Sequence, residues 1–133
     1  MAGATPIRVL VADDDRLFRE SVLALFWKEE RIEVVGYASN GEEAVERAGA
    51  LRPDVVTMDL QMPVMGGLEA TRAIAERLPG VRVVVVAASD DPDHPQLARE
   101  AGAAAYVTKS RMATDLLDTI LTVAGGGDFV AAT

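Results

Sequence analysis

Five short apolar runs, spread along the whole chain, constrain the fold more than any other feature of the sequence. They are rich in Val, and three of them are nearly continuously apolar instead of alternating between apolar and polar residues. Such runs are typical of strands buried on both faces, as in a parallel sheet. The runs cover 7–12, 33–38, 54–58, 81–88 and 104–108.

Segments with helical spacing of apolar residues lie between these runs and after the last one. The segment from about Pro95 to Ala101 is short and weakly patterned, whereas the other four carry clear stripes. Repeated alternation of strand and helix predicts an α/β domain with a doubly wound, parallel, five-stranded sheet and helices on both faces. The stripes are Phe18, Val22, Leu25 and Phe26; Ala44, Val45, Ala48 and Leu51; Leu68, Thr71, Ile74 and Leu78; Leu116, Ile120 and Val123.

The length of 133 residues suits one domain, which we expect over 7–124. Residues 1–6 are expected to form a disordered tail, and 125–133 to begin a linker or tail. A net charge of −8 argues against direct binding of nucleic acid. The absence of cysteine excludes disulfides and thiolate chemistry. With no signal peptide and no apolar run long enough to span a bilayer, we expect a cytoplasmic protein without membrane contact.

Charged residues follow three of the predicted strands at their carboxyl ends. Asp13 and Asp14 follow the first strand, Asp59 the third and Lys109 the fifth. In the strand order 2-1-3-4-5, which is borrowed from known doubly wound domains, strands one and three are neighbours and the three carboxylates converge. Two carboxylates ~4 Å apart repel by about 4 kcal/mol at an effective dielectric of ~20. A hard cation such as Mg²⁺ would relieve that repulsion, and Lys109 is a suitable partner for a phosphate.

The stretch VTMDLQMPVMGG, residues 56–67, explains how Asp59 would be presented. Pro63 and the glycines that follow let the chain turn away directly after the strand. The Asp59 side chain then stays at the sheet edge, and the backbone carbonyl of Gln61 is free to face a metal. Met58, Met62 and Met65 are expected to pack around this turn.

Three segments in order resemble the response-regulator receiver domain of two-component signalling, and the resemblance covers nearly the whole chain. VLVADDDRL is similar to the family's acidic pair, VTMDLQMPVMGG to its phosphoacceptor segment, and AAYVTKS to its aromatic–lysine segment. The resemblance implies a flavodoxin-like fold and phosphorylation of Asp59 by a sensor histidine kinase. It also implies Mg²⁺ held by Asp14, Asp59 and the Gln61 carbonyl, with Asp13 acting through water and Lys109 contacting the phosphoryl group. Asp15 matches no ligand of the family and is expected to cap the first helix.

The chain departs from the family at the end of the fourth strand. Ala87 stands where the family carries Thr or Ser, whose hydroxyl binds the phosphoryl group and couples it to a switch aromatic, here Tyr106. The backbone N–H of Ala88 can still bind a phosphoryl oxygen, and Ser89 is an alternative donor. We expect Asp59 to remain phosphorylatable, Tyr106 to lie inward regardless of phosphorylation, and transmission to be weakened or altered.

The sequence leaves several interpretations open of what the domain controls. Ser110, the second strand–helix unit and the AGGGDFV tail resemble the receiver half of NarL/LuxR-type regulators, which implies transcription regulation through a DNA-binding domain outside these residues. A stand-alone or degenerate receiver that acts by protein binding, with a homodimer as one option, is the first alternative. A Mg²⁺ phosphatase of haloacid-dehalogenase type, with Asp13 as nucleophile, is a remote one. In the leading interpretation the domain is not an enzyme, since it catalyses only its own phosphorylation and dephosphorylation.

Two further features of the sequence are predicted to have no role in binding or catalysis. His94, the single histidine, is expected to be a solvated loop residue. Leu23 and Trp27 fall away from the apolar stripe of the first helix, and we favour their being tucked under a neighbouring loop or the last helix over a partner surface.

Overall fold

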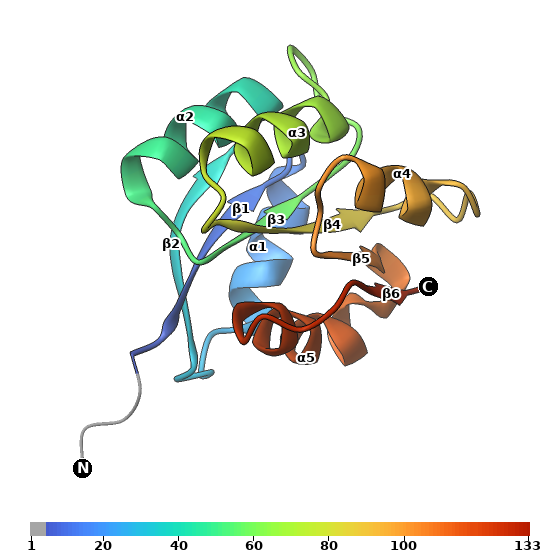
Figure 1. Ribbon diagram of the computed structural model, residues 1–133. Helices are drawn as coiled ribbons and strands as arrows, with labels where there is room; N and C mark the ends of the chain where they lie inside the picture. Colours follow the sequence, from blue (N-terminus) through green and yellow to red (C-terminus); the bar gives the residue numbers. More distant parts are fainter. Residues whose placement is uncertain (1–4) are drawn as a thin grey trace.

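A computed structural model describes residues 5–133 and shows a parallel sheet between two layers of helices (Figure 1). The expected disorder of residues 1–6 falls mostly outside the described residues. The strands are β1 (Ile7–Ala12), β2 (Ile32–Ala38), β3 (Val55–Met58), β4 (Arg82–Ala87), β5 (Ala105–Thr108) and β6 (Val130–Ala132). The helices are α1 (Arg16–Leu25), α2 (Gly41–Leu51), α3 (Gly67–Arg77), α4 (His94–Glu100) and α5 (Met112–Ala124), with a 3₁₀ turn at Lys109–Arg111.

The sheet contains six strands in the order β2-β1-β3-β4-β5-β6, and all of its pairings are parallel. The expected α/β class and the relative order of the first five strands are confirmed. The expected strand number is wrong, because the segment predicted to be a linker or tail contains β6, which pairs with β5. A strand of three residues has too few positions to show a periodic pattern, so no pattern of apolar residues predicts it.

Alternate residues of the central strands pack into two separate cores, one on each face of the sheet. This explains why the sequences of these strands are continuously apolar. Leu10 and Ala12 of β1 pack in the core beneath α2, α3 and α4, whereas Val9 and Val11 pack in the core beneath α1 and α5. In β4 the same alternation places Val83 and Val85 in the first core and Val84 and Val86 in the second. Burying each of these Leu and Val side chains contributes about 1.5–3 kcal/mol relative to leaving it exposed. Burial on both faces thus holds the central strands between the two layers of helices.

Local signals position the starts of the first two helices. The Asp15 carboxylate accepts a hydrogen bond from the Leu17 N–H at 2.9 Å and caps α1, as expected. The Asn40 side chain accepts one from the Glu43 N–H at 2.8 Å and caps α2. Both caps satisfy N–H groups that lack a partner within the helix.

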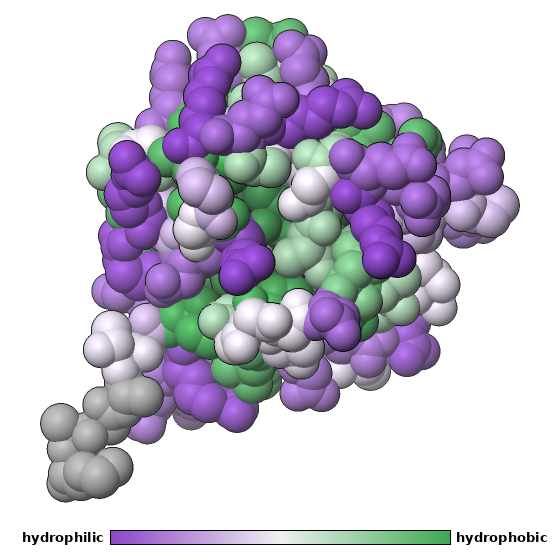
Figure 2. Space-filling view, in the orientation of Figure 1, coloured by the Kyte–Doolittle hydropathy of each residue, from purple (hydrophilic) through white to green (hydrophobic). Residues whose placement is uncertain are grey.

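The molecular surface is polar over the outer faces of the helices. Figure 2 shows hydrophilic side chains covering the helices at the top of this view, with apolar surface exposed between them and the lower layer. Along residues 5–133, no helix has the length and apolarity needed to cross a membrane.

Candidate functional site

Three carboxylates meet at the carboxyl edge of the sheet. Asp13 and Asp14 follow β1, Asp59 follows β3, and one oxygen of each lies within 4.8 Å of the others. The backbone fixes this arrangement, because the Asp59 N–H donates to the Ala12 carbonyl at 3.0 Å and so ties the ends of the two strands together. Asp13 is 1% exposed and Asp59 is 8% exposed, whereas Asp14 is exposed. The convergence expected from strand order is therefore present.

Lys109 brings the positive charge to this cluster. Its Nζ lies 2.8 Å from Asp13 Oδ2 and 3.8 Å from Asp59 Oδ2. The ammonium also sits 4.2 Å from the centre of the Phe18 ring, a cation–π contact that holds it over α1. Lys109 is thus directed at the carboxylates instead of being a solvated surface lysine.

Asp13 is held in one orientation by its neighbours. Its Oδ1 accepts from the Asp15 N–H at 2.8 Å, and its backbone carbonyl accepts from the Arg19 guanidinium at 2.7 Å. Oδ2 is fully buried, and its contact in the described part of the chain is the charged group of Lys109. This oxygen has capacity for one more electropositive ligand.

The electrostatics favour an additional cation. Burial, and after it the charge of Asp13, raises the pKa of the Asp59 carboxyl to about 6. Lys109 and the Leu60 backbone N–H oppose that rise in pKa without cancelling it. Without a metal, Asp59 therefore resists ionisation more than an ordinary aspartate.

The donor set and the available space fit Mg²⁺. The carboxylates and Gln61 line a pocket of about 490 Å³ that opens at the sheet edge. Hard oxygen ligands in an open pocket suit an ion that keeps several waters and leaves room for a phosphate. Asp13, Asp14 and Asp59 offer the carboxylates, while the role of the Gln61 carbonyl stays a prediction.

The turn after β3 is built around a close backbone approach. A Cβ at Gly67 would lie 1.9 Å from the carbonyl oxygen of Asp59, so any side chain there collides with the backbone of Asp59. The Gly67 N–H also donates to the Leu60 carbonyl at 2.9 Å. Val64, in the same turn, has φ +68°, a left-handed conformation that is strained for a β-branched residue. Met58 is buried and Met62 and Met65 pack against the same core, as expected.

The opposite wall of the pocket comes from the end of β4 and the loop that follows it. Ala87, Ala88 and Ser89 line this wall, and Ala87 offers no hydroxyl. Tyr106, on β5, lies inward and is 1% exposed, with its hydroxyl donating to the Ser89 carbonyl at 3.1 Å. Burial raises the pKa of the Tyr106 phenol, and the nearby charges of Asp91 and Asp90 add to that rise.

His94 borders this pocket, which sequence reasoning missed. It is the first residue of α4 and is only 23% exposed, so the expectation of a solvated loop residue is wrong. Its Nε2 lies 3.7 Å from Asp91 Oδ2, and its buried Nδ1 has no hydrogen-bond partner among the described residues. Only the path of the loop between β4 and α4 brings His94 to the pocket, and no sequence motif marks that path.

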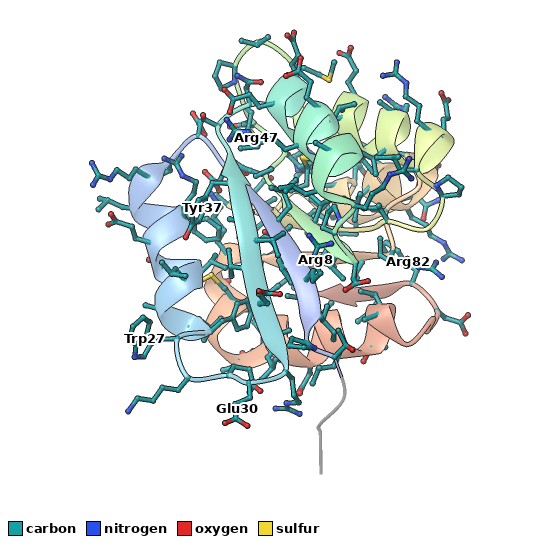
Figure 3. All side chains as sticks on the ribbon, turned by 90° about the vertical axis from the view of Figure 1, so that its left-hand side faces the viewer. Arg8, Trp27, Glu30, Tyr37, Arg47 and Arg82 are labelled. Atoms are coloured by element: carbon teal, nitrogen blue, oxygen red, sulfur yellow. The ribbon has the colours of Figure 1, made fainter. Side chains whose placement is uncertain are left out.

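Leu23 and Trp27 lie on the surface instead of being tucked under a neighbour. Trp27 is 75% exposed and projects from the end of α1 (Figure 3), and Leu23 is 39% exposed. Leu23 borders a shallow hollow with Arg16, Arg19, Glu20 and Tyr37 of β2. The expectation of shielding is wrong because Val22 of α1 and Phe26 at its end enter the core beneath the helix, whereas Leu23 and Trp27 do not belong to that core.

Comparison with known proteins agrees with this geometry. The family model "Response regulator receiver domain" matches residues 9–121. The chain is 38% identical over 125 residues to response regulator GacA of Pseudomonas viridiflava, covering 94% of this chain and 58% of GacA. It is 37% identical over 124 residues to transcriptional regulatory protein DegU of Brevibacillus brevis, covering 93% of this chain and 52% of DegU. The chain thus spans little more than half the length of these relatives.

Solved structures show the same fold. A two-component response regulator of the LuxR family from Aurantimonas sp. SI85-9A1 superposes with a TM-score of 0.88 at 31% identity, covering 94% of this chain and 89% of that one. The response regulator domain of Thermotoga maritima CheB gives a TM-score of 0.85 at 32% identity, covering 91% of this chain and 98% of that one. From the family match and these relatives, the chain belongs to the response-regulator receiver family of two-component signalling, among receivers of NarL/LuxR type.

Proposed function

We propose that Asp59 is the phosphoacceptor and that a sensor histidine kinase supplies the phosphoryl group. The observation that carries this proposal is the placement of Lys109 Nζ between two buried carboxylates, 2.8 Å from Asp13 and 3.8 Å from Asp59. A carboxylate flanked by an ammonium and by further acidic ligands suits transfer of a phosphoryl group more than any other chemistry of these residues.

Transfer of the phosphoryl group replaces a P–N bond by a P–O bond. An Asp59 carboxylate oxygen attacks phosphorus, the P–O bond forms, and the P–N bond to the kinase histidine breaks. Bound Mg²⁺ would neutralise charge on the phosphoryl oxygens. Asp14, Asp59 and the Gln61 carbonyl are the proposed ligands, with Asp13 acting through water.

The protein's own groups would hold the product. Lys109 is close enough to Asp59 to pair with one phosphoryl oxygen, and the Ala88 N–H is the proposed donor to another. In autodephosphorylation, water attacks phosphorus and the P–O bond breaks, which returns the Asp59 carboxylate and inorganic phosphate. This self-directed reaction needs no separate substrate, so the domain acts as a signalling module.

The test is intact-mass analysis after incubation with Mg²⁺ and acetyl phosphate. The wild type is expected to gain one phosphoryl group, and Asp59→Asn none. Asp15→Asn, which changes an acidic residue of the same pocket that caps α1, serves as the matched control and is expected to be labelled. Equal labelling of Asp59→Asn and the wild type would refute the assignment.

Ala87 and Tyr106 are proposed to set how far phosphorylation changes the surface. The inward Tyr106 is held by a backbone carbonyl, so its position does not require a hydroxyl at residue 87. We therefore expect Ala87→Thr to strengthen the response of dimerisation to beryllofluoride. An equal response in both proteins would refute this role for Ala87. A receiver that never takes phosphate and acts by protein binding is the second candidate, and it is favoured by the missing hydroxyl alone.

The relatives suggest the output. DegU is named a transcriptional regulatory protein, and it is about twice as long as the matched region. We propose that this receiver regulates transcription in the cytoplasm through a LuxR-type DNA-binding domain beyond these residues, with homodimerisation as part of the response. The Mg²⁺-phosphatase alternative has no support in the family match, and Asp13 is buried against Lys109.

A further inference from the structure

The last residues of the chain extend the sheet at the edge of β5. Val130 is paired with Ala105, Ala131 with Tyr106, and Ala132 with Val107. This pairing covers backbone groups of β5 that would otherwise lie at the open edge of the sheet. The C-terminal segment is therefore a sixth strand that masks β5.

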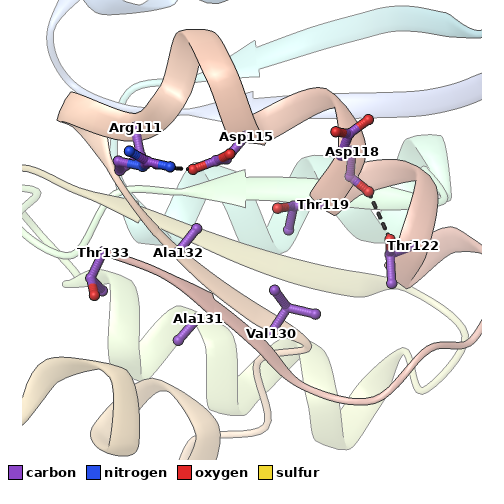
Figure 4. A pocket seen from close by; sticks show the side chains of 9 residues that line it. All are labelled: Arg111, Asp115, Asp118, Thr119, Thr122, Val130, Ala131, Ala132 and Thr133. Carbon is purple, nitrogen blue, oxygen red and sulfur yellow. Dashed lines mark hydrogen bonds and ion pairs between the residues drawn. The ribbon is translucent and has the colours of Figure 1, made fainter.

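Side chains on both sides of β6 anchor it. Val130 and Ala132 point toward α5 (Figure 4) and pack against the core beneath it. Phe129 packs against the other core, and the Arg99 guanidinium of α4 lies 5.5 Å from its ring centre. Ala131 is exposed and contributes mainly its backbone.

The attachment is nevertheless limited. The strand has three residues and follows Gly125, Gly126 and Gly127, of which Gly126 has φ +84°. An open surface groove of about 440 Å³ runs beside β6, and Asp115, Asp118 and Thr122 of α5 line its helical side (Figure 4). A strand of three residues that follows three glycines and has an open groove beside it belongs to the low-stability part of a structure.

The end of β6 also lies beside Tyr106. Tyr106 is the β5 partner of Ala131, and it donates to the Ser89 carbonyl. Thr133 lines the same pocket as Tyr106 and Ser89, with a volume of about 440 Å³. The inward ring and the docked tail thus share both a backbone pairing and a cavity wall.

We propose that β6 is a detachable strand whose docking is linked to the inward position of Tyr106. The docked state of β6 and the inward position of Tyr106 favour each other, because outward movement of the Tyr106 ring would disturb the β5 backbone and the pocket at which β6 ends. By thermodynamic reciprocity, whatever holds Tyr106 inward protects β6, and release of β6 loosens Tyr106. The use of this link as a signal rests on the proposed function, because phosphorylation of Asp59 would be the input.

Hydrogen exchange of the full chain measures the first half of the link. Tyr106→Phe removes the bond to Ser89 while keeping the ring, and we expect exchange of the β6 amides to become about two- to fivefold faster. Tyr37→Phe, on the opposite edge strand β2, is the matched control and is expected to leave β6 unchanged. Exchange at β1 reports global opening and is expected to stay constant in both variants.

Fluorine NMR of the 3-fluorotyrosine-labelled chain measures the reverse half. Phe129→Ser is expected to release β6 and to shift or split the Tyr106 resonance while leaving the Tyr37 resonance in place. Ala131→Ser, at an exposed position of the same strand, is the control. The proposal is overturned if hydrogen exchange shows that Phe129→Ser releases β6 while the Tyr106 resonance stays unchanged. It is also overturned if Tyr106→Phe leaves the exchange rates of the β6 amides unchanged.

Beryllofluoride with Mg²⁺ separates this link from the proposed function. We expect it to slow β6 exchange in the wild type but not in Asp59→Asn. If mass analysis shows phosphorylated Asp59 while β6 exchange ignores beryllofluoride, the signalling use of β6 is refuted and the phosphoacceptor assignment stands. The alternative outcome is that Asp59 takes no phosphoryl group while Tyr106→Phe still speeds β6 exchange and Phe129→Ser still shifts the Tyr106 resonance. In that case the phosphoacceptor assignment is refuted and the link between β6 and Tyr106 stands.

Discussion

The two walls of the Asp59 pocket are built in different ways. On the side of β1 and β3, buried carboxylates are held by strand ends, by the Asp15 N–H and by Lys109. On the side of β4, the wall is formed by Ala87 and Ala88, by a partly exposed loop, and by His94, whose Nδ1 has no partner within residues 5–133. The charged wall is held by more hydrogen bonds and ion pairs than the opposite wall, so we expect it to be the more rigid of the two.

The largest expected effect tests the rigidity of the charged wall. Gly67→Ala would place a Cβ 1.9 Å from the Asp59 carbonyl oxygen, so the turn must shift. We expect a loss of about 3 kcal/mol or more in the free energy of unfolding, measured by urea denaturation. Gly80→Ala is the control, since apart from its two chain neighbours no heavy atom of the described residues lies within 4 Å of a Cβ there, and it should change stability by less than about 0.5 kcal/mol. Equal effects at the two glycines would show that the turn is not tightly fitted.

The second effect is a pH dependence that arises from the charged wall. The pKa of Asp59 is raised from 3.8 to about 6, so the folded state binds this proton more tightly than the unfolded state does. Its contribution to stability is fully present below pH 3.8 and is lost as the pH rises through about 6. The loss amounts to at most about 3 kcal/mol in the absence of metal.

Urea denaturation of wild type and Asp59→Asn in EDTA, between pH 4.5 and 7.5, would measure this loss. The variant should lose less stability than the wild type over that range, and Mg²⁺ should restore the wild type at pH 7.5. Parallel pH profiles for the two proteins would contradict the raised pKa.

A smaller effect is expected on the opposite wall. Tyr106→Phe removes the hydrogen bond to the Ser89 carbonyl but keeps the buried ring. We expect a loss of about 1 kcal/mol in the free energy of unfolding, the value of an ordinary hydrogen bond. Thermal and urea unfolding would measure it, with Tyr37→Phe as comparison. A loss as large as that of Gly67→Ala would mean that the two walls are equally rigid.

The smallest effect should be a gain. Val64 is 78% exposed and has φ +68°, so it contributes little packing and is strained. Val64→Gly removes the strain of about 1–2 kcal/mol but makes the unfolded chain more flexible, for a net gain of about 0.5–1 kcal/mol. Val64→Ala retains a Cβ and should gain less. Destabilisation by the glycine variant would show that the Val64 side chain has a packing role that its exposure conceals.

The contrast between the walls also separates what could be predicted from what could not. Asp13, Asp14, Asp59 and Lys109 could be placed from the sequence because each follows a strand that its apolar pattern identifies. His94 could not, since its position depends on the path of the loop between β4 and α4. Trp27 was misplaced for a related reason: the helical pattern shows which side it occupies but not whether a neighbour covers that side.

By itself the sequence determined the parallel α/β architecture, the placement of the acidic residues at the carboxyl ends of strands and the turn after Asp59. These features follow from local periodicity, from strand direction and from the special conformations of glycine and proline. Only the tertiary structure decided that residues 130–132 add β6, that the Tyr106 hydroxyl donates to the Ser89 carbonyl, and that His94 borders the pocket. Each of these depends on contacts between segments far apart in the chain, and their energies leave no periodic pattern in the residues themselves.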